Sequence, residues 1–268
     1  MQRLTGLGRR LLGRGGAAGG ANGRAGWRAT DVGWLIDAPS ATFIYDAPAP
    51  VPLPEPASNH AKSPHACPAI LAHRGGLHQI ACPLDLHLRV RNLDTPRPVL
   101  VNAAGDRSAV SRQVLDQMVT LMPRDRWLHP DRPLLQVSAP WRFVSDANVW
   151  LNQLPPFYHY RSEPLPGLMI GGRFPIRLWP RSLMWAFEWH DTQRDLRLRR
   201  GEPWFYVWFE TEQPQRRVRL LEAQMTDALR EYCNGLDGAA AHVNQTYALF
   251  RTASQRRPTQ LLHKKVRD

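Results

Sequence analysis

The chain has few cysteines and no long run of apolar residues. It contains 3 cysteines among 268 residues, Cys67, Cys82 and Cys233, and an odd count this small does not form the disulfide framework of a secreted scaffold. Free thiols favour a reducing compartment. No apolar run reaches the roughly 20 residues that a helix needs to span a bilayer. Together these absences predict a cytoplasmic protein without a membrane span.

The common catalytic signatures are also missing. The sequence has no Gly-x-Ser-x-Gly nucleophile elbow, no Walker phosphate loop, no dinucleotide fingerprint between a strand and a helix, and no His-Glu-x-x-His helix. These absences exclude several classes of hydrolase, nucleotide-binding enzyme and zinc enzyme in their usual forms. The sequence therefore identifies no catalytic residue by motif.

Acidic residues are absent from the first 30 positions, although the whole chain carries a net charge of +12. Residues 1–30 carry +6 and residues 251–268 carry +5, which leaves +1 for residues 31–250. A nearly neutral body does not favour phosphate binding, so we interpret the two ends as solvated basic tails. Contact of these tails with nucleic acid is the alternative. The N-terminal composition also fits an organellar transit peptide.

Tryptophan, by contrast, is abundant and unevenly placed. Eight of the ten tryptophans lie between Trp127 and Trp208. Because an indole combines a large apolar area with one N–H donor, clustered tryptophans mark a packed core, a ligand groove or an interface. We predict a non-catalytic binding or interaction module built on a Trp-rich sheet, with a protein partner or a second copy of the chain. The predicted ligand-binding residues are Trp141, Trp179, Trp185, Trp189 and Arg200.

The hydrophobic pattern predicts a mainly β fold, either a sandwich or a jelly roll. Leu86–Arg91 alternates apolar and polar residues, as a half-buried strand does. A first strand is predicted at Thr42–Tyr45, and Arg200-Gly201 suggests a hairpin turn. Many short strands separated by Gly or Pro are typical of all-β folds. The further predicted strands are Leu134–Val137, Trp141–Val144, Asn148–Leu151, Leu168–Ile170, Phe174–Trp179, Met184–Trp189, Leu196–Arg199 and Trp204–Glu210.

Helical spacing is found in three places. Ser108–Met122 is predicted to pack on the sheet, Gln215–Tyr232 has the clearest apolar stripe, and Ala240–Arg251 follows it. The alternating prolines between Pro48 and Pro56 predict an extended polyproline segment. The resulting division of the chain is a disordered basic tail at 1–34, a β-sandwich domain at 35–210, C-terminal helices at 211–252 and a basic tail at 253–268.

Two groups of side chains could hold a metal ion. His129 and Asp131, with His190 downstream, follow the order of the facial triad that binds Fe(II), and Arg200 could bind a co-substrate carboxylate. This order resembles that of the iron- and 2-oxoglutarate-dependent dioxygenases, which use a jelly roll, and such an oxygenase is the alternative function. A second group has no Cys-x2-Cys or His-x3-His pair, so buried thiols beside loop histidines are the simpler interpretation. That group is His65, Cys67, His73, His78, Cys82 and His87.

Several short motifs occur in a recognisable order. They are Cys67-Pro68-Ala69-Ile70, the run Gln79–Leu88 with Pro83-Leu84-Asp85, Trp141-Arg142-Phe143 after Pro140, Pro155-Pro156, and Gly201-Glu202-Pro203. In this order they resemble an uncharacterised family of tailed-phage and bacterial proteins, which carries a Cys-Pro turn, a Pro-x-Asp sequence before the first core strand, a Pro-Trp strand and a late Gly-x-Pro hairpin. The resemblance covers about residues 40–210 and implies a compact β domain, with no activity attached to it.

Overall fold

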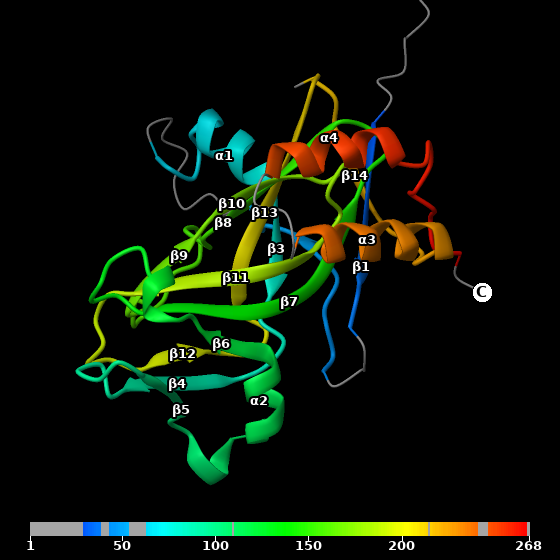
Figure 1. Ribbon diagram of the computed structural model, residues 1–268. Helices are drawn as coiled ribbons and strands as arrows, with labels where there is room; N and C mark the ends of the chain where they lie inside the picture. Colours follow the sequence, from blue (N-terminus) through cyan, green and yellow to red (C-terminus); the bar gives the residue numbers. More distant parts are fainter. Residues whose placement is uncertain are drawn as a thin grey trace, which may run out of the picture.

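A computed structural model of the protein describes residues 29–38, 43–53, 63–108, 110–213, 215–240 and 246–266. In this part of the chain fourteen strands form three sheets, accompanied by four α-helices and two short 3-10 turns at Gly105–Arg107 and Arg124–Arg126 (Figure 1). The predicted mainly β, sandwich-like fold is therefore confirmed. Most of the N-terminal tail predicted at 1–34 lies outside the described residues, but residues 30–34 belong to a partly buried strand and not to a disordered tail.

The first sheet is built around one long strand. Its order is β14 (Val218–Glu222), β1 (Thr30–Ile36), β7 (Leu134–Val144), β11 (Ser182–Trp189) and β9 (Gly167–Ile170), and β6 (Val119–Leu121) also pairs with β7. The first half of β7 pairs with β6 and its second half with β1, while β11 pairs along the other edge. β1 and β14 are parallel, and the other pairs are antiparallel.

The second and third sheets complete the β structure. The second has the order β10 (Gly172–Pro175), β8 (Val149–Leu154), β13 (Pro203–Thr211), β3 (Leu77–Ala81) and β2 (Ala49–Pro50). The third has the order β12 (Leu196–Leu198), β4 (Leu86–Arg91) and β5 (Val99–Asn102). The helices are α1 (Pro68–Gly75), α2 (Arg112–Met118), α3 (Asp227–Ala240) and α4 (Thr246–Arg256). Figure 1 shows α3 and α4 together at one end, and α2 beside the third sheet.

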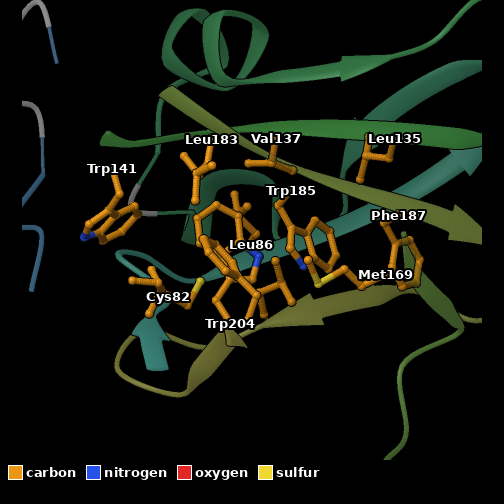
Figure 2. Packing of buried hydrophobic residues seen from close by; sticks show 14 of the residues in the cluster. Cys82, Leu86, Leu135, Val137, Trp141, Met169, Leu183, Trp185, Phe187 and Trp204 are labelled. Carbon is orange, nitrogen blue, oxygen red and sulfur yellow. The ribbon is translucent and has the colours of Figure 1, made fainter. Parts of the chain in front are cut away.

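Aromatic rings from the first two sheets meet in the core. Strand alternation buries Trp185 on the same face of β11 as Phe187 and Trp189. The ring centroids of Trp185 and Trp204 are 5.8 Å apart, those of Trp141 and Trp204 6.3 Å apart (Figure 2). Each buried aromatic side chain removes about 150–250 Å² from water, so these rings supply much of the apolar contact between the sheets.

Two predicted helices differ from the structure. Ser108–Met122 contains only the short helix α2, because Val119–Leu121 pairs with β7 as β6. Gln215–Tyr232 was the clearest helical pattern, yet Val218–Glu222 forms β14 beside β1 and the helix begins only at Asp227. Pairing with β1 satisfies the backbone of this segment, and the Thr226 hydroxyl then accepts a hydrogen bond from the N–H of Leu229 at 3.2 Å.

Several strand boundaries also differ. The two strands predicted between residues 134 and 144 are one continuous strand, β7. Gly201 adopts a φ of +81° in the turn between β12 and β13, but these strands belong to different sheets, so the turn is not a hairpin. Phe174–Trp179 leaves the sheet after Pro175. Residues 43–45 form no strand, and residues 41–42 lie outside the described residues.

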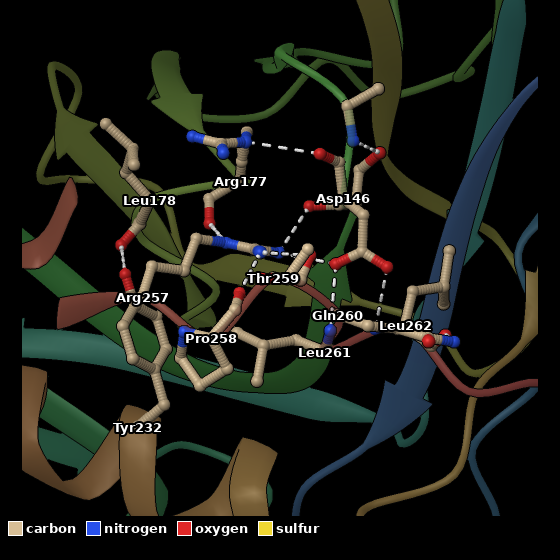
Figure 3. Close-up of polar contacts among 12 residues, drawn as sticks. Asp146, Arg177, Leu178, Tyr232, Arg257, Pro258, Thr259, Gln260, Leu261 and Leu262 are labelled. Carbon is tan, nitrogen blue, oxygen red and sulfur yellow. Dashed lines mark hydrogen bonds and ion pairs between the residues drawn. The ribbon is translucent and has the colours of Figure 1, made fainter. Parts of the chain in front are cut away.

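The C-terminal residues are packed where a solvated tail was predicted. Leu261 has no exposed surface, and the Arg257 side chain is 1% exposed. Its guanidinium donates to the Asp146 carboxylate at 2.7 Å and to the backbone oxygens of Arg177 at 2.6 Å and Ser145 at 2.9 Å (Figure 3). The same carboxylate accepts from the N–H groups of Leu261 and Leu262. Residues 257–262 are therefore bound to the loop that follows β7.

No helix within the described residues has the length and apolar character needed to cross a membrane.

Candidate ligand-binding cavity

The predicted ligand-binding residues are not gathered on one exposed surface. Trp141, Trp185 and Trp189 have no exposed surface. Trp179 is partly buried and packs 5.5 Å from the Phe250 ring, while Arg200 is exposed in the turn before β13. Most of the predicted tryptophan face is therefore the interior of the sandwich and not an exposed binding surface.

The predicted Fe(II) ligands do not converge. The imidazole of His190 lies 2.6 Å from the carboxylate of Glu188, and Arg132 is 3.7 Å from the same carboxylate. His129 and Asp131 lie in an exposed turn in which the His129 ring accepts from the backbone N–H of Asp131. Among the described residues, no three His, Cys, Asp or Glu side chains are grouped to hold a metal ion. The geometric condition for a facial triad is not met.

The cysteines are buried thiols or loop residues. All three are free, and burial raises the pKa of Cys82 to about 12 and that of Cys233 to about 11. A thiol with such a pKa stays protonated at neutral pH and is a poor nucleophile and metal ligand.

A cavity of about 600 Å³ opens between the 155–169 segment and the core. Phe157, Tyr158 and Tyr160 line its wall, and the buried indoles of Trp185 and Trp204 also line it. We call it the aromatic cavity. Its volume lies within the about 300–1,000 Å³ that is usual for small-molecule sites. The lining thus includes two core tryptophans, which themselves have almost no exposed surface.

Local sequence explains how the wall is placed. Pro155 and Pro156 end β8 because proline lacks the N–H that continues a sheet. The chain then turns, with the N–H of Phe157 donating to the Pro155 oxygen at 2.9 Å and that of His159 to the Pro156 oxygen at 2.9 Å. At Gly167 the chain rejoins the first sheet beside Trp189. The wall is therefore a loop fixed at both ends by strands.

An ion pair lies at the polar side of this wall. Arg161 Nη1 is 2.9 Å from Glu202 Oε2, and His159 Nε2 is 3.9 Å from the same oxygen. Burial, followed by the nearby charge of Arg161, lowers the pKa of His159 below its usual range. The imidazole is therefore neutral at neutral pH, and the guanidinium already has a counter-ion.

Buried polar atoms without a hydrogen-bond partner in the described chain concentrate at this site. They are nine in all, and five belong to the cavity lining or to its ion pair: His159 Nε2, Arg161 Nε, Glu202 Oε2, Trp185 Nε1 and Trp204 Nε1. Buried polar groups in native proteins are nearly always paired. The indole N–H groups of Trp127, Trp141 and Trp189 follow this rule and donate to backbone oxygens. The two indoles of the cavity differ in this respect from those three tryptophans, although Nε1 of Trp179, which does not line the cavity, also lacks a partner.

This difference gives a stability prediction for two tryptophans on the same strand. Trp185 and Trp189 are both fully buried on β11, but only Trp189 donates, to the oxygens of Asp191 and Arg194. We expect Trp189→Phe to lower the free energy of unfolding by about 1–2 kcal/mol more than Trp185→Phe, because it also removes hydrogen bonds. Urea denaturation of the two variants measures the difference; equal losses, or a larger loss at position 185, would contradict it.

The rim of the cavity is exposed and aromatic. Phe157 is 49% exposed and Tyr160 is 86% exposed. The His73 ring stacks on Phe157 with centroids 5.7 Å apart, and its Nδ1 lies 3.1 Å from the Tyr158 hydroxyl. Sequence reasoning missed this segment because a loop has no hydrophobic period. The run from Phe157 to Arg161 directly after two prolines was the signal that could have found it.

Comparison of the chain with family models, with curated proteins and with solved structures found no match. The resemblance to tailed-phage and bacterial proteins therefore stays a prediction.

Proposed function

We propose that the protein is a non-catalytic binding module that takes a small organic ligand into the aromatic cavity. The observation that carries this proposal is the cavity itself, which is about 600 Å³ in volume and is lined by the aromatic side chains of Phe157, Tyr158 and Tyr160. A ligand with an apolar ring and a polar group would pack its ring on this aromatic wall. Small-molecule sites commonly have this composition, mostly apolar with a few placed polar groups.

Binding rather than catalysis is supported by the state of the reactive groups nearby. The carboxylate of Glu202 is held by Arg161. The charges of both residues affect the pKa of the nearby Cys82 thiol. Burial is the largest effect and raises this pKa, so the thiol is protonated. A protonated thiol is a poor nucleophile and the carboxylate is held in an ion pair, so the state of these two groups supports binding.

The test is a titration of the full-length protein with phenylacetamide, which has one phenyl ring and one amide. The ¹⁵N–¹H resonances of the indole N–H groups report each tryptophan separately, and Trp185→Phe and Trp204→Phe assign the two of interest. We expect saturable shifts of these two resonances with a Kd near 1 mM, corresponding to about −4 kcal/mol. The resonances of Trp141 and Trp189, whose N–H groups are bonded within the protein, should stay in place.

A matched variant checks the site. Trp204→Phe replaces the indole of a lining residue by a smaller ring, so affinity for phenylacetamide should fall several-fold because part of the apolar lining is removed, a loss of about 1 kcal/mol. Trp208→Phe changes a partly exposed indole on the same strand, β13, that does not line the cavity, and it should leave affinity unchanged. Shifts spread evenly over all indole resonances, or an equal effect of both variants, would refute the proposal.

A further inference from the structure

We infer that the outward face of the third sheet is a docking surface for the phosphate backbone of double-stranded nucleic acid. The inference does not depend on the proposed function or on the aromatic cavity. The surface is formed by Arg89 and Arg91 on β4, Arg197 on β12 and Arg199 directly after it, and we call it the arginine face. Its exposure, its charge and the polar character of its side chains carry the argument.

Strand alternation places these arginines on one exposed side of the sheet. Every second residue of β4 is buried, and Arg89 and Arg91 take exposed positions between them. On β12 the two leucines are buried, whereas Arg197 between them is exposed, as is Arg199. Because Arg197 pairs in register with His87 of β4, the arginines of both strands share the outward face. Figure 1 shows the third sheet beside α2, at the end of the molecule away from α3 and α4.

The positive charge of the folded body is concentrated on these strands. Residues 85–91 carry +1 and residues 194–200 carry +3, whereas residues 31–250 together carry only +1. The remainder of the body is therefore net negative, and its nearly neutral sum conceals one strongly basic surface. A cluster of basic side chains on one face is the electrostatic pattern of a protein that binds nucleic acid.

Three of the four arginines are available to a partner. Arg89 donates to both carboxylate oxygens of Asp195, at 2.6 and 2.7 Å, and these hydrogen bonds lower the pKa of Asp195 to about 2. Within the described residues, the side chains of Arg91, Arg197 and Arg199 have no hydrogen-bond or ion-pair partner. Residues two apart on a strand are separated by about 7 Å, so neighbouring guanidinium groups can each bind a separate phosphate through their forked donors.

The composition of the arginine face favours duplex nucleic acid over the other acidic partners. A protein interface has an apolar centre with aromatic anchors, but the outward positions of β4 and β12 hold only arginines and His87. The outward apolar residues, Val99 and Val101, lie at the margin on β5. Single strands are usually held by bases stacked on aromatic rings, and none of these described positions holds Phe, Tyr or Trp. Contact with the phosphates of a duplex requires only the charges that are present.

The test measures binding of a fluorescein-labelled, G·C-rich DNA duplex of ten base pairs to the full chain over a series of salt concentrations. The triple variant Arg91→Gln, Arg197→Gln and Arg199→Gln removes three charges from the arginine face. We expect its affinity to fall at least about tenfold at low salt. The slope of log affinity against log salt should become shallower by about 2.5, because each lost phosphate contact removes about 0.9.

A second triple variant removes the same net charge elsewhere. Arg216→Gln, Arg217→Gln and Arg230→Gln change exposed arginines outside the third sheet, so affinity should fall less than about threefold. Equal effects of the two variants, or no binding by the native chain, would overturn the inference, because the tails or the net charge would then account for any binding. Polyglutamate of twenty residues, with about the charge of the duplex, should bind at least about tenfold more weakly. Equal or tighter binding of polyglutamate would indicate an acidic protein partner and would also overturn the inference.

Discussion

Replacing Arg257 by methionine is expected to lower the free energy of unfolding by about 3–5 kcal/mol, the range for breaking a buried ion pair. The Arg257 side chain is 1% exposed, and its guanidinium serves the carbonyl oxygens of Ser145 and Arg177 as well as the Asp146 carboxylate. Methionine fills part of the volume but leaves all three acceptors without this donor. Buried acceptors that lose their partner carry the desolvation cost that the hydrogen bond had offset.

The neighbouring arginine supplies the control. Arg256 ends α4 with an exposed side chain, so Arg256→Met removes the same charge and should cost less than about 1 kcal/mol, the size of a helix-terminus charge effect. Chemical denaturation followed by circular dichroism measures both variants. A similar loss for the two would mean that net charge, and not the contacts of Arg257, determines stability. Arg257→Lys should restore little of the stability that Arg257→Met loses, because an ammonium cannot reproduce the forked hydrogen-bond geometry of the guanidinium.

The alternation of apolar and polar residues predicted the sandwich, because the apolar side chains on one face of each strand form its core. β4 was expected at Leu86–Arg91 and lies there, since each alternate residue faces the interior. Trp185, Phe187 and Trp189 were expected on one face of a strand, and all three are buried. In these segments the local pattern and the tertiary environment agree, so the sequence alone is sufficient.

The errors occur where distant segments decide the conformation. Val218–Glu222 has apolar spacing that fits a helix, but the edge of β1 offers it a parallel partner, which no local pattern reveals. Arg257 was grouped with solvated charges because its partner Asp146 is more than a hundred residues away. The aromatic cavity was missed for the same reason: Trp185 and Trp204 were recognised as clustered aromatics, but the loop that opens a cavity beside them carries no period.

The loop of the cavity depends on a glycine, and Gly167→Ala is expected to lower the free energy of unfolding by about 3 kcal/mol, at the upper end of overpacking effects. A Cβ at position 167 would lie far inside contact distance of the Glu188 carbonyl oxygen and 2.9 Å from the Phe187 ring. Neither neighbour can yield, since Glu188 belongs to the backbone of β11 and the Phe187 ring is fully buried. Strand β9 must therefore move away from β11.

Because Gly167 and Met169 both line the cavity, this displacement should also weaken phenylacetamide binding at least tenfold, and the indole shifts measure that loss directly. Gly235→Ala is the matched control: in α3 nothing lies within 4 Å of the added Cβ, so alanine should stabilise the protein by about 0.5–1 kcal/mol. The two substitutions add the same methyl group, but one is expected to lower the free energy of unfolding and the other to raise it. A Gly167→Ala protein as stable as the native chain would show that β9 is free to shift, and the wall of the cavity would then not be the fixed element on which the binding argument depends.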